Sequence, residues 1–172
     1  MGDAMAYDKH LQAAAGISAR CAVITLSDTR TEANDASGAT IQLHLKSAGH
    51  HIAHYAIIRD DPSEFEPALK ALLNDDSIDA ILTNGGTGIS RRDQTIDVID
   101  QLIDHPLPGF GELFRMLSWQ QIGSGAMLSR ATAGIANGKP IFAVPGSSKA
   151  VELAMTQLIL PELRHILSEL RK

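Results

Sequence analysis

Short apolar runs alternate along this chain with segments whose apolar residues recur at helical spacing. The predicted strands cover residues 21–26, 51–58, 79–83 and 141–144. The first and last of these runs are almost continuously apolar, which is typical of strands covered on both faces. Helical periodicity fills the intervals, and this alternation of strand and helix predicts right-handed βαβ units. We therefore expect an α/β fold with three layers (α/β/α), in which helices cover both faces of a mostly parallel sheet.

Turn and cap residues mark the ends of the predicted helices. Gly49 supplies a C-terminal stop for the first of them. Asp61 precedes a proline and Glu64, which is the order of an N-cap, a first-turn proline and a capping-box acid. Asp61 is therefore the expected cap, and Asp60 is left for another role at the end of its strand. Pro161 is expected to break or kink the last long helical segment.

Two further segments complete the predicted organisation. Asn137-Gly138 has the chemistry of a tight hairpin turn, so residues 132–144 are expected to form two antiparallel strands. Residues 1–18 show little amphipathic order and are predicted to be a flexible N-terminal extension. Residues 19–172 are then one domain, because a chain of 172 residues with 44% apolar content can bury one substantial core.

Composition narrows the classes of partner. The net charge is -5 and aromatic residues make up 4% of the chain, whereas nucleic-acid-binding surfaces combine basic stripes with aromatics. No apolar run approaches the roughly 20 residues that span a membrane, and the N-terminus shows no signal-peptide segment. We therefore expect no nucleic-acid partner, no membrane partner and a cytoplasmic location. Cys21 is expected to be a buried hydrophobe. His50, His51 and His54 do not form a zinc set, because His51 and His54 would point to opposite faces of a strand and no cysteine lies nearby. All three are therefore expected to be surface residues.

The candidate chemistry lies in loops that follow two of the strands. The first loop, residues 84–88, reads Asn-Gly-Gly-Thr-Gly, and its glycines allow backbone amides to approach an anion closely. A helix pattern follows, whose unpaired N-terminal amides would face the same ligand. The second loop, residues 145–149, reads Pro-Gly-Ser-Ser-Lys. The first loop lacks the ending of a P-loop, and glycines alone can merely turn a chain, so these loops indicate anion binding without identifying a ligand.

The motifs occur in an order that resembles one known family. The matching segments are residues 84–88 with Arg92-Asp93, residues 109–118, Leu128-Ser129-Arg130-Ala131 and Pro145-Gly146-Ser147. Over residues 20–165 the chain resembles the MoaB/MogA family of molybdenum cofactor biosynthesis proteins, and the segment 109–118 is similar to the MoaB branch. Asn84 stands where this family often has threonine, and Ser148 where proline is common. Neither change removes a backbone amide donor.

The resemblance implies a molybdopterin-binding domain that transfers an adenylyl group, so that ATP and molybdopterin give adenylylated molybdopterin and pyrophosphate, with Mg²⁺. A cation makes physical sense, because charges about 5 Å apart at a dielectric of about 20 repel by roughly 3 kcal/mol. A helix N-terminus returns only about 0.3–1 kcal/mol. Carboxylates that hold a cation are therefore expected. Asp93 is the first candidate for catalysis and for Mg²⁺, and Asp60 matches a second acidic position of the family.

A larger set of residues is predicted to bind the substrates. These are Ser27, Asp28, Gly85, Gly86, Thr87, Gly88, Arg92, Pro145, Gly146, Ser147 and Lys149. Asp28 could equally be a turn residue, and the cations near the motifs, Arg115 and Arg130 among them, could each pair with surface acids. No general base is required, because the terminal phosphate of molybdopterin is already anionic near neutral pH. Catalysis would then consist of positioning and charge neutralisation.

Two alternatives stay open from the sequence. A non-catalytic protein that binds molybdopterin, or delivers it to the molybdenum-inserting enzyme, would keep the loops without turning over ATP, and a scaffold with a vestigial site would lose anion binding. The apolar group Phe110, Phe114, Leu117 and Trp119 is either core or a subunit interface. An interface fits the homotrimer or hexamer that the family resemblance implies.

Overall fold

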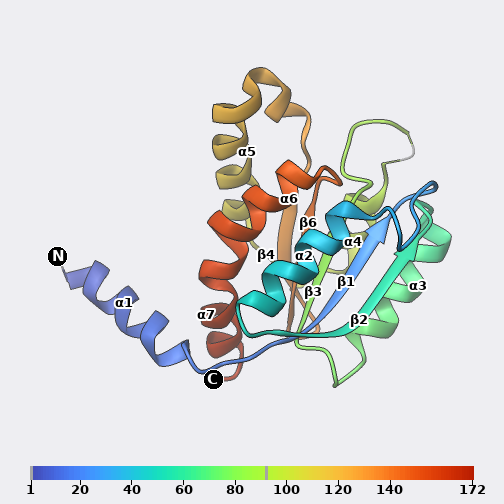
Figure 1. Ribbon diagram of the computed structural model, residues 1–172. Helices are drawn as coiled ribbons and strands as arrows, with labels where there is room; N and C mark the ends of the chain where they lie inside the picture. Colours follow the sequence, from blue (N-terminus) through green and yellow to red (C-terminus); the bar gives the residue numbers. More distant parts are fainter. Residues whose placement is uncertain (1, 92) are drawn as a thin grey trace.

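The computed structural model describes residues 2–91 and 93–172, and these form a six-stranded sheet with helices on both sides (Figure 1). The strand order is β2-β1-β3-β6-β5-β4. The strands are β1 (Arg20–Leu26), β2 (His51–Ile58), β3 (Ala80–Asn84), β4 (His105–Pro106), β5 (Thr132–Ala136) and β6 (Lys139–Val144). Neighbours from β2 to β6 pair in parallel, whereas β5 pairs antiparallel with both β6 and β4. The predicted α/β fold with a mostly parallel sheet is confirmed.

Helices form the outer layers. They are α1 (Gly2–Ala14), α2 (Ala36–Ser47), α3 (Pro62–Leu73), α4 (Thr95–Leu102), α5 (Pro108–Ile122), α6 (Ser148–Ala154) and α7 (Leu160–Leu170). A 3₁₀ segment, η1 (Gly123–Leu128), follows α5, and a π-helical turn, η2 (Met155–Ile159), joins α6 to α7. One apolar cluster packs α2, α5, α6 and α7 on one face of the sheet, and a second packs α3 and α4 on the other. Three layers result.

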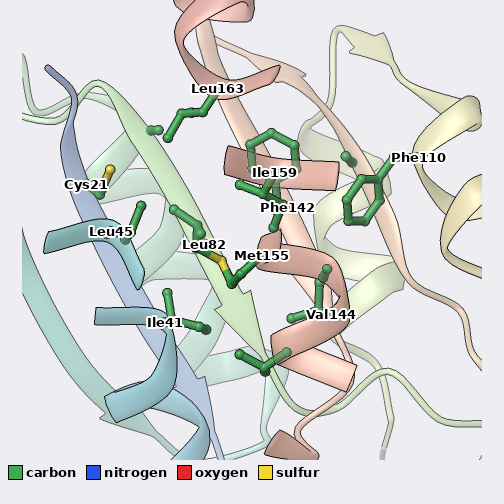
Figure 2. Close-up of a cluster of buried hydrophobic side chains, with 14 of the residues drawn as sticks. Cys21, Ile41, Leu45, Leu82, Phe110, Phe142, Val144, Met155, Ile159 and Leu163 are labelled. Carbon is green, nitrogen blue, oxygen red and sulfur yellow. The ribbon is translucent and has the colours of Figure 1, made fainter. Parts of the chain in front are cut away.

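The strand β1 shows why the sheet is buried on both sides. Cys21 and Val23 belong to the cluster under α2 and α6, part of which Figure 2 shows, whereas Ala22 and Ile24 belong to the cluster under α3. All four side chains are fully buried. Burial raises the pKa of the Cys21 thiol to about 12, so Cys21 stays a neutral thiol and packs as a small hydrophobe, as the sequence predicts.

Local signals read from the sequence are found in place. Asp61 is the N-cap of α3, and its side chain accepts a hydrogen bond from the backbone N–H of Ser63 at 2.8 Å. Asn137 and Gly138 join β5 to β6 with φ values of 47° and 71°. Positive φ at both positions is the requirement of a type I′ hairpin turn. The expected cap and the expected hairpin are therefore confirmed.

The structure shows a helix in the N-terminal extension, where none was expected, and shows how the last helical segment passes Pro161. The predicted loose extension is a helix over most of its length, α1, which extends away from the sheet in Figure 1 and packs along α7. The Tyr7 hydroxyl donates a hydrogen bond to Glu162, and Ala14 is fully buried. A helix that contacts its neighbour along one short stretch needs no wide apolar stripe, so its periodicity is weak. Near Pro161, where a break or kink is expected, a π-helical turn, η2, separates α6 from α7, and this wider turn accommodates the missing proline N–H.

The histidines at positions 50, 51 and 54 differ in how deeply they are buried. His51 and His54 are exposed, as expected. His50 is buried, with 3% of its surface exposed, and its Nδ1 accepts a hydrogen bond from the backbone N–H of Ala19 at 3.0 Å. Burial, with Arg164 nearby, lowers the pKa of His50. The surface prediction is wrong for His50, because the turn before β2 places it inward.

Among the described residues, no helix is long and apolar enough to cross a membrane.

Candidate functional site

The two glycine loops come together at the carboxyl ends of β3 and β6. These strands are neighbours in the sheet, so the loops that follow them emerge side by side. The backbone N–H of Gly85 donates to the carbonyl oxygen of Val144 at 3.1 Å. Both loops line a cavity of about 440 Å³. The predicted site residues among its walls are Gly85, Gly86, Thr87, Gly88, Asp93, Pro145, Gly146 and Ser147.

Glycine is required at the start of the first loop. Gly85 has a φ of 101°, and a Cβ at this position would lie 2.2 Å from the carbonyl oxygen of Leu26. Gly86 has a φ of 61°, and its Cβ would meet Asp60 Oδ1 at 2.5 Å. The loop therefore packs its backbone directly on β1 and on Asp60, which a side chain would prevent.

We expect Gly85→Ala to destabilise the protein by about 2 kcal/mol more than Gly138→Ala. Both alanines would adopt an unfavourable positive φ, at a cost of about 1–2 kcal/mol each. A Cβ on Gly138 would have no heavy atom within 4 Å, whereas a Cβ on Gly85 would overlap the backbone of Leu26. Urea unfolding of both variants measures the difference, and equal losses would contradict the close packing of this loop.

Asp60 lies in the loop between β2 and α3, and Asp93 lies between β3 and α4, and both are near the first glycine loop. Asp60 follows β2, and Thr95 Oγ1 at the start of α4 donates to its Oδ1 at 3.4 Å. Burial raises the pKa of Asp60, and the nearby negative charges of Asp93 and then Asp28 raise it further. Asp93 Oδ2 accepts a hydrogen bond from the backbone N–H of Ser90 at 2.8 Å. The structure thus gathers carboxylates whose charges oppose one another at the edge of the cavity.

This arrangement fits a hard divalent cation. A cation would relieve the mutual repulsion that raises the pKa of Asp60. Within residues 2–91 and 93–172, no group of three or more histidine, cysteine or carboxylate side chains is placed to hold a metal alone. Mg²⁺ is commonly held by one or two carboxylates together with waters and substrate phosphates. Asp60 and Asp93 are therefore suited to a metal that arrives with a phosphorylated substrate.

The remaining predicted residues lie around this site. The Ser27 hydroxyl accepts hydrogen bonds from the backbone of Thr29 and Arg30, so it shapes the turn after β1. Asp28 lies 4.0 Å from Arg59 Nε and within electrostatic reach of Asp60. Lys149 is exposed at the start of α6 and lines a separate cavity of about 810 Å³ between α2, α5 and α6. Arg92 lies outside the described residues.

One residue at the site escaped the sequence analysis. Arg30, in the loop after β1, donates from Nη2 to the carbonyl oxygen of Gly146 at 2.6 Å. Its Nη1 lies 3.2 Å from Asp35 Oδ1 and 3.4 Å from Asn84 Oδ1. A single guanidinium thus connects the loops that follow β1 and β6 with the end of β3. The loop containing Arg30 shows no glycine motif, so periodicity and motif order did not indicate this role.

Beneath Arg30 lies a buried polar network centred on Asp35, whose side chain is fully buried. Asp35 accepts hydrogen bonds from the Thr25 hydroxyl at 2.5 Å and the Tyr55 hydroxyl at 2.8 Å. Its Oδ1 also accepts from the backbone N–H of Gly38 at 3.0 Å. Asn84 joins the network by donating to Thr25 Oγ1 at 2.9 Å. Asparagine at position 84 therefore serves to connect β3 with β1 below the glycine loop.

The fold and the site together define an α/β/α domain whose two loops and carboxylates, at the carboxyl edge of the sheet, are suited to an anionic ligand. Residues 22–165 match the family described as "Probable molybdopterin binding domain". The chain belongs to this family of molybdenum cofactor biosynthesis proteins.

Similar proteins agree in sequence and in structure. Molybdenum cofactor biosynthesis protein B of Bacillus subtilis (strain 168) is 50% identical over 169 residues, which cover 98% of this chain and 99% of that protein. A crystal structure of a molybdenum cofactor biosynthesis protein B superposes with a TM-score of 0.88 at 50% identity, covering 90% of this chain and 97% of the other. The tungsten cofactor synthesizing protein MoaB of Pyrococcus furiosus gives a TM-score of 0.78 at 39% identity, covering 90% of this chain and 98% of that one. These are MoaB-type relatives across nearly the whole domain.

Proposed function

We propose that this protein is a molybdopterin adenylyltransferase, which transfers AMP from ATP to the terminal phosphate of molybdopterin and releases pyrophosphate. One observation carries the proposal: both anion loops and Asp93 line the same cavity, with Asp60 at its edge. An adenylyl transfer must bring two phosphorylated reactants together, and two adjoining loops of backbone amides meet that need. Membership in a molybdenum cofactor biosynthesis family supports molybdopterin as the acceptor.

In the proposed reaction, a terminal phosphate oxygen of molybdopterin attacks the α-phosphorus of ATP. The bond between that phosphorus and the oxygen bridging to the β-phosphate breaks, and the electron pair leaves with pyrophosphate. The glycine loops orient the phosphates through backbone N–H groups, and Asp60 and Asp93 would hold Mg²⁺. When bound, Mg²⁺ supplies positive charge against the phosphate oxygens. The protein contributes positioning and electrostatics, since the attacking oxygen needs no base.

Pyrophosphate release tests this function directly. The purified protein is incubated with ATP and Mg²⁺, with and without molybdopterin, and pyrophosphate is measured over time. We expect release only when molybdopterin is present. If molybdopterin binds, as measured by its absorbance or fluorescence, but no pyrophosphate forms, the protein is a binding or delivery protein and the proposed activity is wrong.

We also infer that the protein assembles with copies of itself through the face formed by α5 and η1. The predicted apolar group divides here: Phe110 and Phe114 are buried, whereas Trp119 is 60% exposed. Exposed apolar side chains gather on the same segment. They are Leu113, Met116, Trp119, Ile122, Met127 and Leu128. Contiguous apolar residues of this kind are typical of protein interfaces, and closed symmetric oligomers are the usual result.

Trp119→Glu is expected to dissociate this assembly. A buried tryptophan at the centre of an interface contributes about 2 kcal/mol or more, so the dissociation constant should rise at least about 30-fold. Leu43→Glu is the matched control, because Leu43 is 64% exposed on a different helix, α2. Light scattering after size-exclusion chromatography measures the mass of each variant. A monomeric wild type, or an assembly unchanged by Trp119→Glu, would contradict the inferred interface.

A further inference from the structure

Among the described residues, Arg130 makes four hydrogen bonds, and all of them reach the residues around Asp93. Arg130 lies between η1 and β5, and its backbone N–H donates to the carbonyl oxygen of Thr87 at 3.2 Å. Its Nη2 donates to the carbonyl oxygen of Asp93 at 2.7 Å. Nη1 and Nη2 also contact the two carboxylate oxygens of Asp97, in the first turn of α4, at 3.1 and 2.8 Å. One residue therefore holds both ends of the loop and the helix that follows it.

The geometry leaves the guanidinium little freedom. A bidentate pair with a carboxylate fixes the plane of an arginine side chain. Arg130 Nε is buried and has no hydrogen-bond partner among the described residues, so this polar atom is desolvated by the packing around it. Desolvating a polar N–H without a partner is unfavourable, and the three hydrogen bonds that Nη1 and Nη2 donate offset that cost. The burial of Nε distinguishes this ion pair from an ordinary surface pair, in which the whole guanidinium stays exposed to water.

The bond to the Asp93 carbonyl bears on the Asp93 side chain. Peptide groups are planar, so holding the carbonyl oxygen of Asp93 fixes the direction of the chain at its Cα atom. The same residue also closes a local turn, because its backbone N–H donates to the carbonyl oxygen of Ser90 at 3.1 Å and its Oδ2 accepts from Ser90 N–H. With both ends of Asp93 restrained, the direction of its carboxylate is set by contacts outside the substrate cavity.

We propose that Arg130 is a positioning residue for Asp93: through its contacts with Thr87, Asp93 and Asp97 it maintains the geometry that presents the Asp93 carboxylate to the phosphorylated substrates. The proposal rests on the adenylyl transfer proposed above, but the restraint of the loop is testable without turnover. Lysine in place of Arg130 keeps the charge but offers donors from one nitrogen only. It cannot contact both Asp97 oxygens and the Asp93 carbonyl in the arginine geometry.

Arg20 offers a closely matched control. Like Arg130, it binds both oxygens of an aspartate, Asp79, at 2.9 Å each, and donates to a backbone carbonyl, that of Asp76, at 2.9 Å. Arg20 is the first residue of β1, whereas the candidate site lies at the carboxyl ends of the strands, at the opposite edge of the sheet. Arg20→Lys therefore removes the same set of contacts without touching the Asp93 segment.

The test compares Arg130→Lys with Arg20→Lys by steady-state kinetics and by amide hydrogen exchange over residues 85–97. We expect Arg130→Lys to lower kcat about 10–100-fold with little change in KM for ATP, and to speed exchange at Ser90 and Asp93. Arg20→Lys should leave both unchanged. If Arg130→Lys keeps kcat, or lowers it without faster exchange, the positioning role is wrong. If the wild type itself is inactive, the proposed function fails, and exchange alone decides: faster exchange supports positioning, and unchanged exchange overturns it.

Discussion

Asp93→Asn is expected to lower the rate of adenylyl transfer by about 10²–10³-fold while leaving the fold intact. Electrostatic groups aimed at reacting phosphates typically contribute this much to kcat. The amide oxygen of asparagine can still accept the hydrogen bond that Ser90 N–H donates to Asp93 Oδ2. The substitution therefore removes the negative charge that would hold Mg²⁺ and preserves the local turn. Turnover at saturating ATP and molybdopterin measures the effect.

The control for this prediction is Asp76→Asn. Asp76 is exposed in the loop between α3 and β3, at the other end of the sheet from the cavity. The Asp76→Asn substitution removes one carboxylate from the protein and so changes the net charge by the same amount as Asp93→Asn. We expect it to leave kcat within about twofold and unfolding free energy within about 0.5 kcal/mol. If Asp93→Asn retains more than about a tenth of the wild-type kcat, Asp93 is not the principal catalytic carboxylate.

Asp35→Ala is expected to destabilise the fold by about 3–5 kcal/mol. The substitution leaves the Arg30 guanidinium without its buried partner, and it leaves the hydroxyls of Thr25 and Tyr55 without the acceptor they share. It also removes the side chain that caps α2 through Gly38 N–H. Urea unfolding at neutral pH measures the loss. A loss below about 1 kcal/mol would show that the network does not stabilise the carboxyl edge of the sheet.

The same network predicts a dependence on pH. Burial by itself raises the pKa of Asp35, but hydrogen bonds from Thr25, Gly38, Tyr55 and Ser37 outweigh burial and lower it. A lowered pKa in the folded state means that ionised Asp35 stabilises the fold above the unfolded-state value of about 3.9. That contribution is lost as the pH falls below about 4 and through the folded-state pKa. Unfolding free energies from pH 7 to 3 should fall more steeply in the wild type than in Asp35→Asn.

The order of the main strands and of several helices could be predicted from the sequence, because the buried strands are apolar runs and some boundaries have a local signal, but the sequence predicts neither α1 nor β4. Asp61 caps α3 and Asn137-Gly138 turns the hairpin through contacts with near neighbours in the chain. The sequence also placed each loop at the end of a predicted strand, whereas the contact between the two loops follows from the pairing of β3 with β6, which the structure shows. Local chemistry and one topological rule account for these successes.

The features that the sequence did not reveal depend on contacts between distant residues. Arg30 contacts Gly146 across 116 positions, and Arg130 contacts Asp93 across 37. Neither belongs to a periodic pattern, and arginines near a motif are as often surface ion pairs. His50 is buried because of the turn that precedes β2, which composition does not show. The roles of these side chains follow from packing, and packing is visible only in the folded chain.

The proposed adenylyl transfer is tested most directly by mass spectrometry of the products formed from molybdopterin, Mg²⁺ and ATP, with wild-type protein and with Asp93→Asn in parallel. We expect adenylylated molybdopterin together with pyrophosphate from the wild type, and almost none from the variant. Bound molybdopterin with no adenylylated product from the wild type, or equal product from both proteins, would contradict it.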